Sequence, residues 1–339
     1  MKWKFYSLAF VAGMSILTAC SSDDNNDNDG NGGNGNGNEI ENGTILKGTI
    51  TSDVTLAAGN TYKLSGEYIV EEGATLHIEE GVKIIAVYDD IADYILVKQG
   101  GKINAVGTPD KPIVMTSEKE EPGAWGGIHI CGRAHTNAEG GKGSSEIGGA
   151  VYGGNDDADN SGTLQYIRLE YTGFAFDEEH EANGISFYGV GNGTIVDHCQ
   201  AYKGSDDGFE FFGGSVNVSN LVAVSCSDDS FDWTEGWNGK GTNLVAYQED
   251  KSTLGYDCDC LMECDNNGSN NAATPVAHPV LKNLILVGNG GSKQGIRLRA
   301  GTEVEIDNAK VCGKGQPLTV ETALTENALK NGLSLIHIS

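Results

Sequence analysis

Apolar residues recur along this chain in short runs that have one polar residue at their centre. The two clearest runs are Phe209-Glu210-Phe211 and Phe231-Asp232-Trp233, whose first residues lie 22 positions apart. Side chains alternate in direction along a strand, so each run predicts a short strand with its apolar pair on one side. A repeat of this length, carried on such strands, is typical of solenoid coils. We therefore predict an all-β fold, a right-handed parallel β-helix.

The same pattern delimits the expected β-helix domain. Glycines break alternating apolar segments from residue 45 onward, and the coils continue to about residue 332. Two polar stretches interrupt them, the Gly-rich residues 132–162 and the residues 265–274. Neither stretch has an apolar period, so we expect both to be surface loops that leave the solenoid.

Several stretches together resemble a known family. They are Trp125-Gly126-Gly127, residues 157–162, residues 205–210 and residues 295–299. The combination is similar to secreted bacterial β-helix lipoproteins of the pectin-lyase-like superfamily, and the likeness covers most of residues 45–315. This resemblance implies a β-helix fold and an extracytoplasmic location. It brings no assigned catalytic residues, and a fold does not fix chemistry.

The first residues have the features of a targeting segment. A basic start precedes an apolar run that is too short to span a bilayer, so residues 1–19 are expected to be a signal peptide. Leu17-Thr18-Ala19-Cys20 resembles the bacterial lipobox, in which the cysteine is lipidated; an ordinary signal peptide with a chance cysteine is the alternative. Residues 20–44 are acidic and rich in Asn, Gly and Asp, so we expect a disordered tether.

Location and partners follow from this segment and from charge. Ser22-Asp23-Asp24 resembles the export signal of surface lipoproteins in Bacteroidetes-type bacteria. The resemblance implies a lipid anchor in the outer membrane and display at the cell surface, with a periplasm-facing position as the alternative. A formal net charge of −26 argues against nucleic acid and anionic lipid as partners, because such a surface repels both. We expect a monomer.

The last residues, 333–339, look like the translation of a sequencing-library transposon end. We treat them as an artefact and exclude them from the expected fold. The natural chain is then expected to continue, with further coils and a cap beyond a truncated C-terminus.

Stacking of the coils would align the polar centres of the runs into one column on the outer surface. The column contains His129, Ser186, Glu210, Asp232, Glu263 and Arg297. If each apolar pair points inward, these centres point outward, about 4.8 Å apart from coil to coil. The candidate ligand-binding residues are Glu210, Asp232, Trp233, Glu263 and Arg297, although Trp233 also fits a solenoid core.

Two successive turns before these strands are acidic, Asp206-Asp207 and Asp228-Asp229. Stacked carboxylates about 5 Å apart repel by about 3 kcal/mol at an effective dielectric constant near 20. A bound cation, retained protons or splaying into water would relieve this repulsion. Hard cations prefer several oxygen ligands, so Asp206, Asp207, Asp228 and Asp229 are a candidate Ca²⁺ site, and no other cofactor is expected. A solvated acidic face is the alternative.

Three functions are consistent with these features. The leading hypothesis is that the acidic outer face binds a carbohydrate or another extracellular ligand, with help from Ca²⁺. The enzyme hypothesis is a polysaccharide lyase or a glycoside hydrolase with Asp207, Asp229 and Asp232 as catalytic residues, because paired carboxylates act as general acid and base. The third hypothesis is an adhesin or structural surface protein without catalytic activity.

Overall fold

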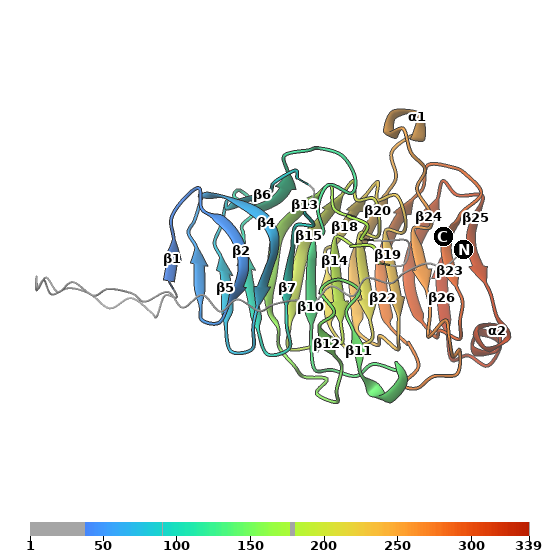
Figure 1. Ribbon diagram of the computed structural model, residues 1–339. Helices are drawn as coiled ribbons and strands as arrows, with labels where there is room; N and C mark the ends of the chain where they lie inside the picture. The colour runs from blue at the N-terminus through green and yellow to red at the C-terminus, as the bar shows by residue number, and fades with distance from the viewer. Residues whose placement is uncertain (1–37, 90, 177–179, 339) are drawn as a thin grey trace, which may run out of the picture. The chain divides into compact units, whose positions relative to one another are not determined.

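The computed structural model describes residues 38–89, 91–176 and 180–338. They form a right-handed parallel β-helix, which confirms the prediction made from the repeat. Each coil pairs with the coil before it and the coil after it, and Figure 1 shows the coils side by side in order of sequence. The signal peptide and the lipidation candidate Cys20 lie outside the described residues.

Three sheet faces make up each coil. The first face carries the runs with a polar centre and consists of the second halves of β2 (Ile45–Ile50) and β4 (Thr61–Val70), then β7 (Tyr94–Val97), β10 (Ile128–Cys131), β14 (Ile185–Tyr188), β16 (Phe209–Phe212), β19 (Phe231–Thr234), β21 (Met262–Cys264), β23 (Gln294–Leu298) and β25 (Gln316–Val320).

The other two faces share several long strands that bend between them. The second face consists of β1 (Asn38–Ile40), β3 (Val54–Leu56), β5 (Thr75–Ile78), β8 (Lys102–Val106), β17 (Asn217–Ser219), β26 (Leu335–Ile338) and the first halves of β13 (Gly162–Glu170), β15 (Ile195–Tyr202), β20 (Lys240–Tyr247), β22 (Val280–Val287) and β24 (Glu305–Cys312). The third face consists of the first halves of β2 and β4, then β6 (Lys83–Ala86), β9 (Ile113–Ser117), β18 (Val222–Val224) and the second halves of the five long strands.

In the part of the chain that the structure describes, the helices are short: the 3₁₀ turn Glu139–Gly141, α1 (Lys251–Leu254) and α2 (Ala323–Lys330). Within the described residues, no helix has the length and apolar character needed to cross a bilayer.

Aromatic rings stack along the axis inside the solenoid. The rings of Phe209 and Phe231 lie 5.6 Å apart, and Phe211 stacks between Phe187 at 5.0 Å and Trp237 at 4.1 Å. All five side chains are buried. In-register stacking of this kind extends the core by one layer per coil, which is how a solenoid buries apolar surface without a single large core.

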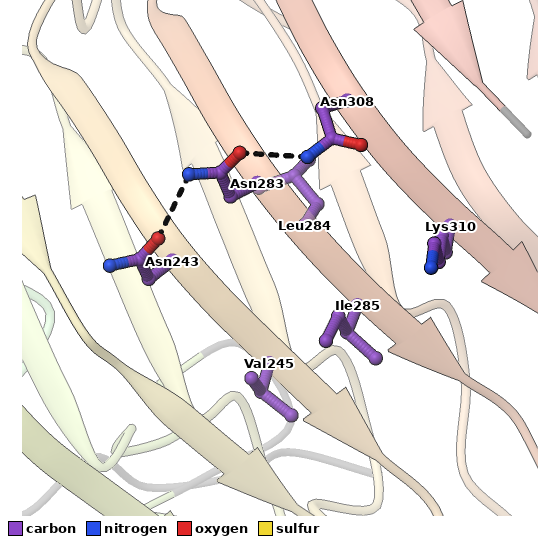
Figure 2. Close-up of a pocket in the computed structure, with 7 residues that line it drawn as sticks. All are labelled: Asn243, Val245, Asn283, Leu284, Ile285, Asn308 and Lys310. Carbon is purple, nitrogen blue, oxygen red and sulfur yellow. Dashed lines mark hydrogen bonds between the residues drawn. The ribbon is translucent and has the colours of Figure 1, made fainter.

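One column of residues turns the chain from the second face to the third. Tyr166, His198, Asn220, Asn243, Asn283 and Asn308 occupy it, with φ between 52° and 60°. Asparagine tolerates this left-handed region better than most residues, because its short amide bonds locally. Each later amide donates to the one before it, beginning with Asn243 to Asn220 at 2.9 Å. Figure 2 shows the next two bonds, Asn283 to Asn243 at 3.1 Å and Asn308 to Asn283 at 2.8 Å.

The Gly-rich stretch 132–162 differs from the expected surface loop. It contains the antiparallel pair β11 (Gly143–Ser144) and β12 (Val151–Tyr152), and it folds back over the outside of the first face. Its Ile147 and Tyr152 form a second apolar cluster with Leu96 and Tyr188, which point outward from that face. This covering segment was missed because its few apolar residues follow no strand or helix period.

The limits of the domain also differ from the expectation. β1 begins at Asn38 and pairs with β3, so the first coil starts earlier than residue 45, inside the expected tether. At the other end, β26 lies within the stretch that we treated as an artefact, and it pairs with β24. The origin of residues 333–339 stays a prediction.

Candidate functional site

The polar centres of the runs stack in register on the first face, but two of them, His129 and Ser186, are fully buried and do not lie on the surface as predicted. Ser186 pairs with Glu210, Glu210 with Asp232, Asp232 with Glu263, and Glu263 with Arg297 in consecutive coils. Phe209 and Phe231, the flanking residues of two of these runs, lie on adjacent rungs and point into the core. The polar centres therefore point to the outer side of the first face.

Trp233 is not part of this outer surface, so its assignment as a ligand-binding residue was wrong. Only 1% of its surface is exposed, and its indole N–H donates to Thr302 Oγ1 at 3.0 Å inside the solenoid. It alternates with the outward Asp232 and so must point inward. Its place in the apolar pair of the run was the signal that favoured the core.

The acidic turns stack directly over one another. The backbone N–H of Asp229 donates to Oδ1 of Asp207 at 2.8 Å, and that of Cys260 donates to Oδ1 of Asp229 at 2.6 Å. The backbone N–H of Asp207 donates in the same way to Oδ1 of Asn183 at 3.2 Å. Gly208 follows Asp207 because a Cβ there would lie 2.6 Å from the Ser230 carbonyl oxygen of the next coil.

Among the described residues, four groups of possible metal ligands overlap at this stack; three consist of carboxylates alone and one includes a cysteine. In each group the ligand atoms lie within 4.8 Å of one another. The groups are Asp206-Asp207-Asp228, Asp207-Glu210-Asp232, Asp229-Asp232-Glu263 and Asp229-Asp259-Cys260. Oδ1 of Asp232 is buried in this cluster and has no hydrogen-bond partner among the residues that the structure describes. We call Asp206, Asp207, Glu210, Asp228, Asp229, Asp232 and Glu263 the acidic site.

Burial makes ionisation of this site costly. Desolvation, reinforced by the charge of Asp228, raises the pKa of Asp206 to about 8. Desolvation is also the largest cause that raises the pKa of Asp207, Glu210, Asp229 and Asp232 well above their ordinary values, and like charges nearby add to it. The solvated acidic face that we considered is therefore not what the fold builds, although Asp228 itself is exposed.

The covering segment supplies an acidic wall that sequence reasoning missed. Glu146 accepts a hydrogen bond from Tyr188 Oη at 3.2 Å, and desolvation raises the pKa of its carboxyl to about 7. Its charge acts on Asp206 and Glu210. Glu235, which follows β19, also contacts the covering segment. Its carboxylate accepts a hydrogen bond from Tyr152 Oη at 2.8 Å. No spacing rule relates Glu146 to the coils.

Comparison with known proteins identifies the family. A family model described as a pectate-lyase-like β-helix domain matches residues 48–338, which is most of the chain. The chain belongs to this family. It is also similar to the catalytic domain of a GH87 α-1,3-glucanase, solved as a variant in complex with tetrasaccharides, at 13% identity and a TM-score of 0.28. That match covers 78% of this chain and 64% of the other chain. Curated proteins offer no match.

In this pectate-lyase-like β-helix, the C-terminal side of the acidic site is neutralised by arginines. Arg297 pairs with Glu263 at 2.8 Å and with Glu321 at 3.0 Å, while Arg299 pairs with Glu263 at 2.5 Å and with Asp265 at 2.7 Å. Glu263 and Arg297 thus have partners already. Among the described residues, Asp207, Glu210 and Asp232 have no ion-pair partner, although Asn183 donates to Glu210 at 2.5 Å and the charge of Arg299 acts on Asp232. Hard cations bind to such sets of oxygen atoms.

Proposed function

We propose that this protein binds an extracellular carbohydrate at the acidic site and that a divalent cation, Ca²⁺ in the first place, is part of the site. Asp207, Glu210 and Asp232 would hold the cation, and Asp206 and Asp228 would line the approach from solvent. The ligand set expected from the sequence consisted only of the turn residues Asp206, Asp207, Asp228 and Asp229. The proposed set keeps one of them, Asp207, and adds Glu210 and Asp232 from the strands.

The unpartnered Oδ1 of Asp232 carries this proposal. A buried carboxylate oxygen without a donor is costly, because it has lost its hydration and gained nothing in return. Its neighbours Asp207 and Glu210 offer oxygens within 4.8 Å and no positive charge. A divalent cation among these oxygens would satisfy the orphan atom and offset the repulsion at once. A sugar hydroxyl or carboxylate could then complete the coordination of the cation from solvent.

Calorimetric titration with CaCl₂, after removal of metal by EDTA and dialysis, tests the cation. We expect saturable binding that Asp232→Asn weakens by about tenfold or more, because one charged ligand is lost. Asp110→Asn, a change at an exposed turn aspartate away from the site, is the matched control. A glycan array probed with and without Ca²⁺ then tests the carbohydrate. If Asp232→Asn binds Ca²⁺ with the same affinity as wild type, this cation site is excluded.

Hydrolysis of a glycan is the second candidate, and the raised pKa values of Asp206 and Glu146 favour it. A carboxyl group that keeps its proton near neutral pH can act as a general acid, and an ionised neighbour can act as base or nucleophile. Release of reducing ends from the array hits would support an enzyme. Binding without product from any hit would favour recognition alone, and binding of no glycan would favour the adhesin or structural alternative.

Location remains part of the same proposal. We propose that Cys20 carries the lipid and that the domain is displayed on the outer membrane. Labelling of cells with a palmitate analogue should mark the wild-type protein and not Cys20→Ala. Protease added to intact cells should degrade the protein if it faces outward and leave it intact if it faces the periplasm.

A further inference from the structure

The corner between the second and third faces forms an outer groove, separate from the acidic site. Two hollows lie along it. The first, of about 220 Å³, is lined by Asn243, Val245, Asn283, Leu284, Ile285, Asn308 and Lys310 (Figure 2). The second, of about 460 Å³, is lined by residues of β15, β17 and β20, including Lys240 and Thr242. The two hollows adjoin at β20, where Thr242 lines the second and the next residue, Asn243, lines the first; we call them together the amide groove.

A row of primary amides follows the bottom of the groove. Asn243, Asn283 and Asn308 are exposed, and the ladder uses one N–H of each amide. A primary amide has two N–H donors and two acceptor positions on its oxygen. Each coil therefore offers one spare donor and at least one spare acceptor, repeated about every 4.8 Å along the axis.

An apolar wall stands beside this row. Val222, Val245 and Ile285 are register partners in consecutive coils, and Tyr247 follows two residues after Val245. Ile285 is 49% exposed and Tyr247 is 46% exposed. Single exposed apolar residues are ordinary, but Val245 and Ile285 lie side by side and both line the first hollow, where a ligand can cover them.

Charge in the groove is balanced, unlike that of the whole chain. The outward charged side chains of β15, β17, β20, β22 and β24 are three lysines, Lys240, Lys282 and Lys310, and three acids, Asp197, Glu305 and Asp307. The chain as a whole carries −26. Because these charges balance, the groove has no net charge with which to select a charged ligand, and it suits an uncharged one.

Other occupants fit less well. An extended peptide binds a sheet by hydrogen-bonding to the backbone of an edge strand, and the strands here are paired on both sides. A second copy of the chain would need about 800 Å² on each partner with an apolar centre, and lysines flank this narrow apolar wall. Amides beside an apolar wall instead match sugar rings, which present hydroxyl groups at their edges and C–H groups on their faces.

We propose that the amide groove is a second binding site, which takes an uncharged linear glycan lying along the axis of the solenoid. Its hydroxyl groups bond to the spare positions of Asn243, Asn283 and Asn308, and its ring faces cover Val245 and Ile285. No cation takes part. This site is independent of the acidic site, so the two can bind different parts of one polysaccharide or two different polymers.

Calorimetric titration of the protein with uncharged hexasaccharides, in buffer that contains EDTA, measures binding to the amide groove and tests the proposal. The probes are cellohexaose, xylohexaose, mannohexaose and maltohexaose, with hexagalacturonate as the charged comparison. We expect at least one uncharged probe to bind, and we expect Val245→Lys and Ile285→Lys each to weaken it by about tenfold. Asp232→Asn should bind that probe as wild type does, which separates this site from the acidic site.

The control variant is Leu324→Lys, at a leucine on α2 that is 46% exposed and does not line either hollow. It should leave binding unchanged, and circular dichroism should show that all variants fold. The proposal is overturned if no uncharged probe binds in EDTA, if only hexagalacturonate binds, or if binding is lost in Asp232→Asn. It is also overturned if wild type is a dimer that Ile285→Lys converts to a monomer, because a second copy then occupies the groove.

Discussion

Replacement of Asp232 by asparagine tests the electrostatics of the acidic site directly. The change keeps the size of the side chain and removes one charge from carboxylates whose oxygens lie within 4.8 Å of one another. Two unit charges at that distance repel by about 3 kcal/mol when the effective dielectric constant is about 20. The metal-free Asp232→Asn variant should therefore be more stable than wild type at about pH 8 by up to about 3 kcal/mol, or about 6 °C in Tm at about 2 °C per kcal/mol.

The pH dependence of stability has a sign that follows from the same site. Burial and the charge of Asp228 raise the pKa of Asp206 to about 8 in the folded chain, against about 4 in the unfolded chain. The folded chain thus holds this proton more tightly, so its contribution to stability is complete below about pH 4 and is lost as pH rises to about 8. Wild type in EDTA should melt at a lower temperature at about pH 8 than at about pH 5.

Thermal unfolding followed by circular dichroism in EDTA, at both pH values, measures these effects. The difference between the two pH values should be smaller in Asp232→Asn, because its neighbours then ionise more easily. Asp110→Asn should match wild type at both. If wild type and Asp232→Asn melt together at both pH values, the carboxylates are solvated independently of one another and the reasoning is refuted.

Three further predictions concern the core, the ladder and the covering segment. Phe211→Ala should lower the free energy of unfolding by about 3–5 kcal/mol in urea titration, since it opens a cavity between stacked rings. Asn283→Ala should cost about 1–3 kcal/mol, because two ladder hydrogen bonds are lost at φ 58°, and Asn283→Gly should cost less. Glu146→Gln should reduce the fall in Tm between about pH 4 and pH 7, because burial raises the pKa of Glu146 to about 7.

The coils and their register could be predicted because both depend on local, repeated signals. An apolar pair around one polar residue determines which side of a strand points inward, and the 22-residue offset between Phe209 and Phe231 determines which residues stack. The asparagines at Asn220 and Asn243 show the same offset plus one residue. Each such signal lies within a single coil or between two neighbouring coils.

The walls of the acidic site could not be predicted, because long-range contacts make them. Tyr188 meets Glu146 across 42 residues, and Tyr152 meets Glu235 across 83 residues, with no shared period to relate them. The acids themselves were found from their spacing, whereas their burial was not, since it depends on where the covering segment lies. Trp233 was misassigned for a different reason: the alternation along β19 already placed it in the inward apolar pair, and its aromatic type was given more weight than that position.

The turn that holds the acidic site does not itself require negative charge. Asn183, Asp207 and Asp229 occupy equivalent positions in consecutive coils, and each accepts a hydrogen bond from the backbone N–H of the coil that follows. Asn183 does this with a neutral amide, so the ladder would be equally well bonded with asparagine at all three places. Two adjacent carboxylates instead add repulsion of about 3 kcal/mol and lose hydration on burial. Folding alone therefore gives no reason for aspartate at positions 207 and 229. A ligand that carries positive charge, or that takes a proton from these carboxyl groups, would give such a reason.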